Sequence, residues 1–458
     1  MNLSYLILAT FINYFMGTQF LSTRLLTTML IYGALAFSPL SAQLSRVEKK
    51  VVGYVESHQE SALQLLEAVV NINSGSMNFD GVYRVGQIFK TRLDALGFTT
   101  KWIDGKPFDR AGHLVAEHKG KGKTILLIGH LDTVFEPTSP FQRYTQLNDS
   151  TVSGPGVGDM KGGLVVILSS LEALEAAGVL KDMNIIVYMG GDEELSGKPL
   201  ATSRHRLIEA AKQADVALGF ENGDGRIETA NISRRSSTDW ELRITGVPSH
   251  SSQIFTEKVG VGAIYEASRI LLKFYETLKN EEDLTFSPGV ILGGTTIEYD
   301  DDNKAGSAFG KSNVVAKEVL VTGDIRAISP EQLTKAQEVM TEIVANHLPQ
   351  TGGEIVFGEG YPPLAPTSGN LELLSYFDRV SQDLGYGKVA AVNPRDAGAA
   401  DISFVSGYIK MAMDGLGLRS KGGHTVNETA DPRSIKIQAK RAAILIYRLT
   451  QDKLIIRR

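Results

Sequence analysis

Residues 124–132 read TILLIGHLD, a short apolar run that ends directly in a histidine and an aspartate. Two later segments have the same form, NIIVYMGGDEE at residues 184–194 and VALGFE at residues 216–221. Short apolar runs of this kind are typical of buried strands in a parallel sheet. Because ligands of such sheets gather beyond the carboxyl ends of the strands, the sequence predicts a functional site where these acids and the histidine meet.

The segments around these strands have helical spacing. Apolar residues recur at helical intervals in five stretches, at residues 51–71, 82–96, 159–178, 201–212 and 432–449. Strands that alternate with helices in this rhythm predict the α/β class, with a mostly parallel sheet covered by helices.

The pattern changes after about residue 237. Residues 239–246 and 313–328 alternate apolar with polar side chains, as strands with one buried face do, and residues 259–278 have helical spacing. Ser329-Pro330 has the form of a helix cap followed by a first-turn proline. These elements predict an α+β segment inside the α/β chain.

The length of 458 residues also favours two domains, because one hydrophobic core rarely grows so large. We expect a first domain in two parts, at residues 43–236 and 351–458. Between them we expect an inserted lid or dimerisation domain at residues 237–350.

The composition excludes several classes of function. A hydrophobic content of 43% and a charged content of 22% are typical of a globular protein. The net charge of -5, without a long run of lysine or arginine, gives no basic surface for nucleic acid, so we expect no nucleic-acid partner. The chain has no cysteine, so any metal must be held by imidazole and carboxylate groups.

The first 42 residues differ from the rest of the chain. Residues 25–37 form an apolar run, and Ser41-Ala42 supplies small residues for cleavage, which together predict an export signal and a periplasmic or secreted protein. A second apolar stretch at residues 5–15 leaves two alternatives: Met16 is the true start, or the leader is retained as a membrane anchor.

The ends of the predicted strands and the segments after them carry an unusual number of acids beside two histidines. These residues are Asp132, Asp159, Glu193, Glu194 and Glu221, with His130 and His424. Buried carboxylates without partners cost several kcal/mol each, so this group predicts a pair of divalent metal ions. His130 and Asp132 lie two residues apart in extended chain and leave it on the same side, so the acid can orient the ring.

Two motifs are open to more than one interpretation by themselves. The glycine-rich segment SGPGVGDMKGG at residues 153–163 could hold a phosphate, but the spacing of a phosphate loop fails because Gly162 follows Lys161. Its glycines permit a tight backbone around Asp159. Glu193 and Glu194 are either a solvated acidic turn or a pair with divided roles, in which one binds metal and the other accepts a proton from water.

Six motifs occur in order: HLDTV at 130–134, GDMKGG at 158–163, DEE at 192–194, residues 215–221, GVPSHS at 246–251 and GGHT at 422–425. Together they resemble the successive motifs of the zinc-dependent exopeptidase family that includes bacterial glutamate carboxypeptidase, aminoacylase and succinyl-diaminopimelate desuccinylase. The resemblance covers essentially all of the chain after the leader, and the glutamate carboxypeptidase branch is the most similar.

The resemblance implies a centre of two zinc ions, with cobalt or manganese as alternatives. It implies that Asp159 bridges the ions, with His130 and Glu221 completing one site and Glu194 and His424 the other. It further implies that Glu193 is the general base and that Asp132 supports His130.

The resemblance also assigns roles within the inserted domain. It implies that His250 reaches the active site of a neighbouring subunit and stabilises the oxyanion there, so we expect a homodimer formed through the inserted domain. It implies that Asn313 and Arg326 hold the substrate. A guanidinium suits this role, because it can bind a carboxylate with two parallel hydrogen bonds.

The expected activity is hydrolysis of the amide bond to a C-terminal amino acid, in a peptide or an N-acyl amino acid. Two alternatives stay open: an N-acyl-amino-acid deacylase on the same scaffold, and a catalytically inactive binding protein, although no ligand or base is missing. Ala316, Ala400 and the acidic stretch at residues 300–302 depart from the usual motifs of the family. They leave the choice of substrate open and affect none of the expected metal ligands.

Overall fold

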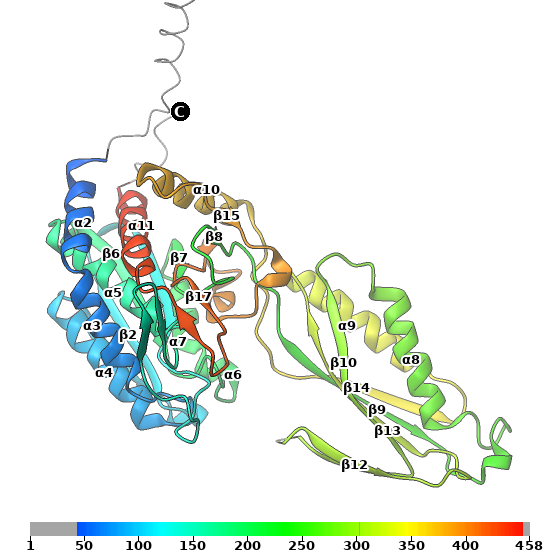
Figure 1. Cartoon of the computed structure of the whole chain (residues 1–458). Coiled ribbons are helices and arrows are strands. Elements are labelled where there is room, and N and C mark those ends of the chain that lie inside the picture. Colours follow the sequence, from blue (N-terminus) through cyan, green and yellow to red (C-terminus); the bar gives the residue numbers. More distant parts are fainter. Residues whose placement is uncertain (1–43, 302, 452–458) are drawn as a thin grey trace, which may run out of the picture. The chain divides into compact units, whose positions relative to one another are not determined.

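The computed structural model describes residues 44–301 and 303–451 (Figure 1). The predicted leader at residues 1–42 lies outside this part of the chain. Within the described ranges, no helix has both the length and the apolar character that a membrane span requires.

The main sheet has six strands in the order β1-β2-β6-β3-β7-β16. Their bounds are β1 Thr99–Asp104, β2 Gly112–His118, β3 Lys121–His130, β6 Met183–Gly190, β7 Val216–Gly219 and β16 Met411–Met413. The four strands from β6 to β16 run parallel, whereas β1 and β2 form an antiparallel edge. The predicted α/β class with a mostly parallel sheet is confirmed.

The register of the parallel strands brings their carboxyl ends together. His130, the last residue of β3, pairs with Gly190, the last residue of β6. On the other side of β3, Ile128 pairs with Gly219 at the end of β7. The segments that follow these three strands therefore leave the sheet at one edge.

Helices cover both faces of this sheet (Figure 1). They are α2 Arg46–Ser57, α3 Gln59–Val70, α4 Phe79–Ala95, α5 Lys161–Ala176, α6 Leu200–Ser203, α7 His205–Ala211, α10 Ser368–Asp383 and α11 Ser434–Thr450. On one face, Ile125 and Leu127 of β3 belong to the core that α5 and α11 share. On the other face, Leu126 and Ile128 pack in the core that includes α7.

One predicted helix is two helices in the structure. The apolar spacing at residues 51–71 predicted a single helix, but α2 ends at Ser57 and α3 begins at Gln59. His58 between them has a φ of -113° and a ψ of 14°, outside the helical region. Its Nδ1 lies 2.9 Å from the carbonyl oxygen of Tyr54 and its ring stacks on the Tyr54 ring, so these local contacts interrupt the helix.

The inserted segment forms a separate antiparallel sheet in the order β10-β13-β9-β14. Its strands are β9 Thr238–Gly246, β10 Thr285–Gly294, β13 Glu318–Arg326 and β14 Thr351–Phe357, and the hairpin of β11 Thr296–Asp300 and β12 Ala305–Phe309 lies beside β10. Helices α8 Gly262–Leu278 and α9 Pro330–Ala345 pack on one face. Strand β14 pairs with β9, so this sheet continues past residue 350.

Two smaller sheets complete the fold. One has the order β17-β18-β5-β4, with β4 Thr145–Asn148, β5 Thr151–Ser153, β17 Ser420–Lys421 and β18 Thr429–Ala430. The other pairs β8 Thr229–Ala230 with β15 Ala390–Ala391. The first of these sheets joins the chain around His424 to the glycine-rich segment before Asp159.

A histidine on β2 is held in its neutral form inside this core. His113 is 0% exposed, and its ring stacks on Phe108. Its Nε2 lies 3.0 Å from the carbonyl oxygen of Ser203, and its Nδ1 accepts the N–H of Gly191 at 3.2 Å. Burial lowers the pKa of His113 to about 4, although the nearby Asp192 carboxylate acts to raise it.

We predict that His113 makes the fold less stable as the pH falls. Its folded pKa of about 4 lies below the usual value of about 6.5, so the unfolded chain binds the proton first. This group should remove about 3 kcal/mol of unfolding free energy between pH 7 and pH 4. Urea unfolding of the metal-free protein tests this against His113→Asn, which should lose less stability over the same range. Equal losses in both proteins would contradict the prediction.

Candidate metal centre

His130 ends β3 and turns one ring nitrogen toward two acids. Its Nε2 lies 3.2 Å from Oδ1 of Asp159 and 3.3 Å from Oε1 of Glu221. Its Nδ1 lies 3.1 Å from the backbone oxygen of Asp132 and 3.4 Å from the Asp132 carboxylate. The ring is therefore fixed by Asp132 on one side and faces the carboxylates on the other.

Asp159 lies between two histidines. Its Oδ1 faces Nε2 of His130, and its Oδ2 lies 3.2 Å from Nε2 of His424. The same nitrogen of His424 lies 3.1 Å from Oε2 of Glu194. Each oxygen of Asp159 thus faces a different imidazole, which is the arrangement that a bridging carboxylate needs.

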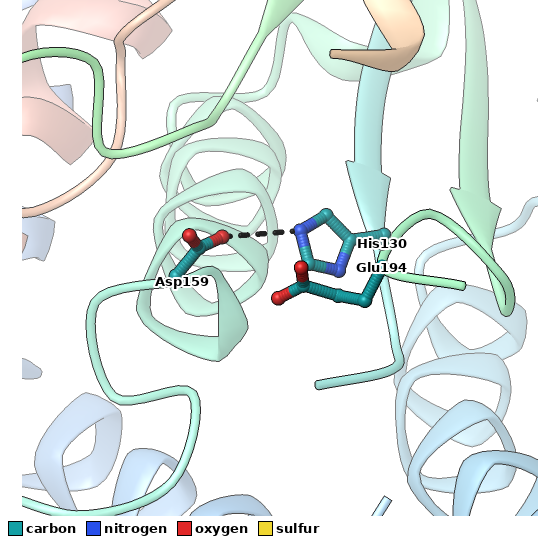
Figure 2. Close-up of side chains that lie close together, drawn as sticks. All are labelled: His130, Asp159 and Glu194. Carbon is teal, nitrogen blue, oxygen red and sulfur yellow. Dashed lines mark hydrogen bonds and ion pairs between the residues drawn. The ribbon is translucent and has the colours of Figure 1, made fainter. Parts of the chain in front are cut away.

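Figure 2 shows three of these side chains pointing toward one another from different elements. His130 comes from the end of β3, Asp159 from the loop before α5, and Glu194 from the loop after β6. His424 lies in the Gly422–Thr425 turn with a left-handed φ of 62°. Since such a backbone is uncommon outside glycine, the surrounding contacts must hold His424 in place.

Burial and neighbouring charges shift the pKa values of the side chains in this cluster. Burial, followed by the charge of Asp159, raises the pKa of Glu221 to about 7. Burial together with neighbouring carboxylates also raises the pKa of Glu193 well above its usual range. The carboxylates of Asp159 and Glu194 accept hydrogen bonds from the His424 ring and raise its pKa to about 11. The cluster therefore favours any added positive charge.

The donor set fits a divalent metal ion. Ligand atoms of His130, Asp159 and Glu194 lie within 4.8 Å of one another. Oε1 of Glu194 is buried and has no hydrogen-bond partner in the described part of the chain, so one acceptor there points at no donor. Imidazole nitrogen and carboxylate oxygen are ligands that zinc accepts, and an ion would satisfy that oxygen.

The sequence of residues 126–448 matches peptidase family M20/M25/M40. The chain belongs to this family. Carboxypeptidase G2 from Pseudomonas sp. strain RS-16 is 26% identical over 418 residues, which cover 89% of this chain and 94% of that protein.

Solved structures of the family share the fold. Aminopeptidase PepT from Bacillus cereus superposes with a TM-score of 0.68 at 17% identity, over 85% of this chain and 98% of that one. A dinuclear metal-binding M20 peptidase from Bacillus subtilis gives a TM-score of 0.60 at 15% identity, over 86% of this chain and 99% of that one. The candidate site around His130 thus belongs to a chain of peptidase family M20/M25/M40.

Behind the M20 site, Asp132 holds more than the ring of His130. Its Oδ1 accepts the N–H of Glu193 and its Oδ2 accepts the N–H of Glu194, both at 3.0 Å. Ser76 donates its hydroxyl to Oδ2 at 2.6 Å. One fully buried carboxylate therefore fixes the histidine and the two consecutive glutamates together.

Glu428 is a supporting residue that the sequence analysis did not find. Its carboxylate accepts the backbone N–H groups of Gly156, Gly158 and Asp159 at 3.0, 2.8 and 3.0 Å. Gly156 has a φ of 74°, so glycine favours the turn that aims these N–H groups. Burial raises the pKa of Glu428 to about 7, although these bonds act to lower it. The only sequence signal was an acid four residues after His424.

A second supporting pair lies behind Glu221. Oδ1 of Asp414 accepts the N–H of Glu221 at 3.1 Å, and Oδ2 accepts Nε of Arg234 at 2.8 Å. Asp414 and Arg234 are both buried, so the guanidinium compensates the charge of the carboxylate. Neither residue belongs to one of the motifs that the sequence analysis assigned to the site.

The three residues predicted within the inserted segment lie on its antiparallel sheet or on loops next to it. His250 is exposed, and its Nδ1 lies 2.8 Å from Oγ of Ser252. The N–H of Ser251 donates to the carbonyl of Asn313 at 2.8 Å, which places His250 beside Asn313. Arg326 ends β13 and binds Oδ2 of Asp324 through Nε at 2.7 Å. Within residues 44–301 and 303–451, no hydrogen bond or ion pair joins these three to the five expected metal ligands.

We predict that replacing Asp159 with Ala weakens both metal sites at once. The variant removes the carboxylate that faces both histidines, so two cations would approach each other with less compensating charge. Metal analysis after dialysis should find less than one ion per chain. A replacement of the exposed Asp80 with Ala, on α4, is the control and should keep the wild-type content. Two tightly held ions in the Asp159→Ala protein would contradict the bridging arrangement.

Proposed function

We propose that this M20 metallohydrolase is a carboxypeptidase that cleaves the amide bond to a C-terminal amino acid of a peptide or an N-acyl amino acid. One observation carries the proposal: Asp159 lies between His130 and His424. Glu193 experiences the charges of His130, Glu221 and Glu194 in the same cluster, and its carboxylate makes no hydrogen bond among the described residues. The similarity to carboxypeptidase G2 along nearly the whole chain supports this choice of substrate.

Two metal ions, zinc in the first place, would be held by residues already in position. Asp159 would bind both ions, His130 and Glu221 one of them, and Glu194 and His424 the other. Such ions polarise the scissile carbonyl and lower the pKa of the attacking water. Cobalt and manganese suit the same nitrogen and oxygen ligands.

Glu193 is suited to act as the general base. The adjacent Glu194 turns its carboxylate to His424, whereas the Glu193 carboxylate makes no hydrogen bond to any described residue. The two glutamates therefore divide the roles of base and ligand. Glu193 can accept a proton from water and deliver it to the amine that leaves, which returns the carboxylate to its starting state.

The inserted sheet would supply contacts to the substrate. Arg326 has 35% of its side chain exposed and donates from Nε to Asp324. Its two terminal nitrogens remain available to donate two parallel hydrogen bonds to a carboxylate of the substrate. His250 and Asn313 lie side by side on this same sheet or its flanking loops. We assign His250 to the oxyanion and Asn313 with Arg326 to the remainder of the substrate.

We also propose a homodimer through the inserted domain. Helix α8 exposes an apolar row to solvent, formed by Ile264, Tyr265, Leu272 and Tyr275, each at least half exposed. Strand β10 is an edge strand of the four-stranded antiparallel sheet, and edge strands in general offer unpaired backbone groups to another chain. An exposed apolar row beside an open strand edge is suited to pair with a second copy.

The substrate proposal is tested by release of free amino acid from a panel of peptidyl and N-acyl amino acids, with the metal-loaded protein that begins at residue 43. Hydrolysis at the C-terminal amide of peptides supports the carboxypeptidase. Hydrolysis of short N-acyl amino acids alone would favour a deacylase. No hydrolysis of any substrate by protein that holds two ions would contradict the proposal.

We predict that replacing Glu193 with Gln separates catalysis from metal binding. Turnover should fall by roughly two to four powers of ten, because a positioned base contributes that much. The metal content should stay at the wild-type value, since Glu193 is not among the ligands. Glu194→Gln is the matched comparison and should lose metal. If Glu193→Gln lost its metal instead, the roles of the two glutamates would be reversed.

We predict that replacing His250 with Ala lowers turnover about a hundred- to a thousandfold, as loss of an oxyanion donor does. If the donor comes from the partner subunit, a mixture of His250→Ala and Glu193→Gln chains should regain activity. One of the two sites of the mixed dimer would then hold an intact base and an intact donor. Mixtures that stay inactive after proven subunit exchange would show that His250 acts within its own chain or not at all.

A further inference from the structure

Tyr361 lies on the chain segment that returns from the inserted sheet, between β14 and α10. Its backbone pairs in both directions with Ser237, on the segment that leads into that sheet: the N–H of Ser237 donates at 3.1 Å and the N–H of Tyr361 at 2.9 Å. Arg234 and Leu364 form the next such pair. Tyr361 is therefore fixed in a two-stranded connection.

The hydroxyl of Tyr361 donates a hydrogen bond to the backbone of Glu193, the proposed general base. Oη lies 2.9 Å from the backbone carbonyl of Glu193, which can only accept, so Tyr361 must be the donor there. Its oxygen then accepts from Nη2 of Arg204 at 2.6 Å and from Oγ of Ser196 at 3.0 Å. Burial raises the pKa of Tyr361 well above its usual range, so the hydroxyl keeps its proton.

The peptide unit between Glu193 and Glu194 is consequently held at both ends. Its carbonyl accepts from Tyr361 at 2.9 Å, and its N–H donates to Oδ2 of Asp132 at 3.0 Å. A trans peptide is planar and points these two groups in opposite directions, so two bonds of this kind prevent it from turning. Because the Glu193 carboxylate has no hydrogen bond of its own in the described chain, its position depends on this backbone.

The anchor behind Tyr361 is a buried cation. Arg204 is 0% exposed and binds Oδ1 of Asp192 at 2.6 Å and Oδ1 of Asp401 at 2.7 Å. Its guanidinium carbon lies 5.5 Å from the ring centres of both Tyr361 and Phe404. Asp192 directly precedes Glu193, so Arg204 fixes the backbone just before the proposed base. Arg204 also fixes the Tyr361 hydroxyl, which binds the carbonyl of Glu193.

We propose that Tyr361 is a positioning residue for the general base Glu193, and that its hydroxyl sets the Glu193–Glu194 peptide from the connection to the inserted domain. This inference rests on the proposed role of Glu193. Among the described residues, the hydroxyl makes no hydrogen bond to the side chain of an expected metal ligand, and it reaches the base through the Glu193 carbonyl. A displacement of about 1 Å in a reacting group can reduce turnover about a hundredfold, so a lost backbone anchor should be measurable.

The test is Tyr361→Phe, which removes the hydroxyl and keeps the ring on Phe404. With a substrate that the panel identifies, kcat should fall about ten- to a hundredfold, KM should change less than about threefold, and the metal content should stay constant. Tyr408→Phe is the control, because Tyr408 is 49% exposed and its hydroxyl has no hydrogen bond within the described residues. Circular dichroism and thermal unfolding check that both variants fold.

A second measurement separates positioning from general structural damage. In the Glu193→Gln protein the base is already absent, so adding Tyr361→Phe should leave kcat unchanged within about twofold in single-turnover reactions at high enzyme concentration. An equal loss in both backgrounds, an unchanged kcat in the single variant, or loss of metal would each overturn the inference. Wild-type turnover in Glu193→Gln alone would instead overturn the assigned base and with it the proposed function.

Discussion

Charge compensation at the carboxyl edge of the main sheet is the constraint on which the rest of this structure depends. Four carboxylates meet two imidazoles there: Asp159, Glu193, Glu194 and Glu221, with His130 and His424. The glutamates are driven toward their neutral forms by burial and by one another. The two divalent ions of the proposed centre would relieve this repulsion, because each would supply two positive charges. The same repulsion would push the acids apart if the backbone did not hold them.

The backbone holds them in one recurring way. The N–H group of each site acid donates to a buried carboxylate that lies behind it. Asp132 receives those of the two consecutive glutamates, Glu428 receives that of Asp159, and Asp414 receives that of Glu221. Each receiving carboxylate has further donors, so its burial is compensated. Loss of such a supporting group in metal sites typically weakens metal binding ten- to a hundredfold.

The inserted domain is joined to the candidate metal centre by two backbone segments, and side chains on these segments also contact residues that support the centre. Of the two connecting segments, one places Arg234 on Asp414, and the other places Tyr361 on the carbonyl of Glu193. These two contacts reach Glu221, which we propose as a metal ligand, and Glu193, which we propose as the base. A change in the connecting segments would therefore affect both residues. The inserted sheet would then influence catalysis independently of any residue that it contributes to substrate binding.

The class of fold and the kind of site could be inferred from the order of amino acids alone. Apolar runs such as residues 124–129 have a length and flanks that suit only a buried strand in this context, and acids at strand ends point to one edge by the geometry of parallel sheets. Ser329 and Pro330 begin α9 as predicted, because a helix cap is a local interaction. Family motifs then identified the expected ligands, and in the structure ligand atoms of three of them, His130, Asp159 and Glu194, lie within 4.8 Å of one another.

The groups that support those acids became visible only in the folded chain. Glu428, Asp414, Arg204 and Tyr361 carry no local signal, because their partners lie far away in the chain and a lone buried acid or tyrosine looks like any other. The interruption at His58 also escaped the apolar pattern, since both helices share one periodicity and only the ring contacts with the preceding turn separate them. Local chemistry fixes elements and motifs, whereas the distant groups that compensate buried charge are chosen by the packing of the whole chain.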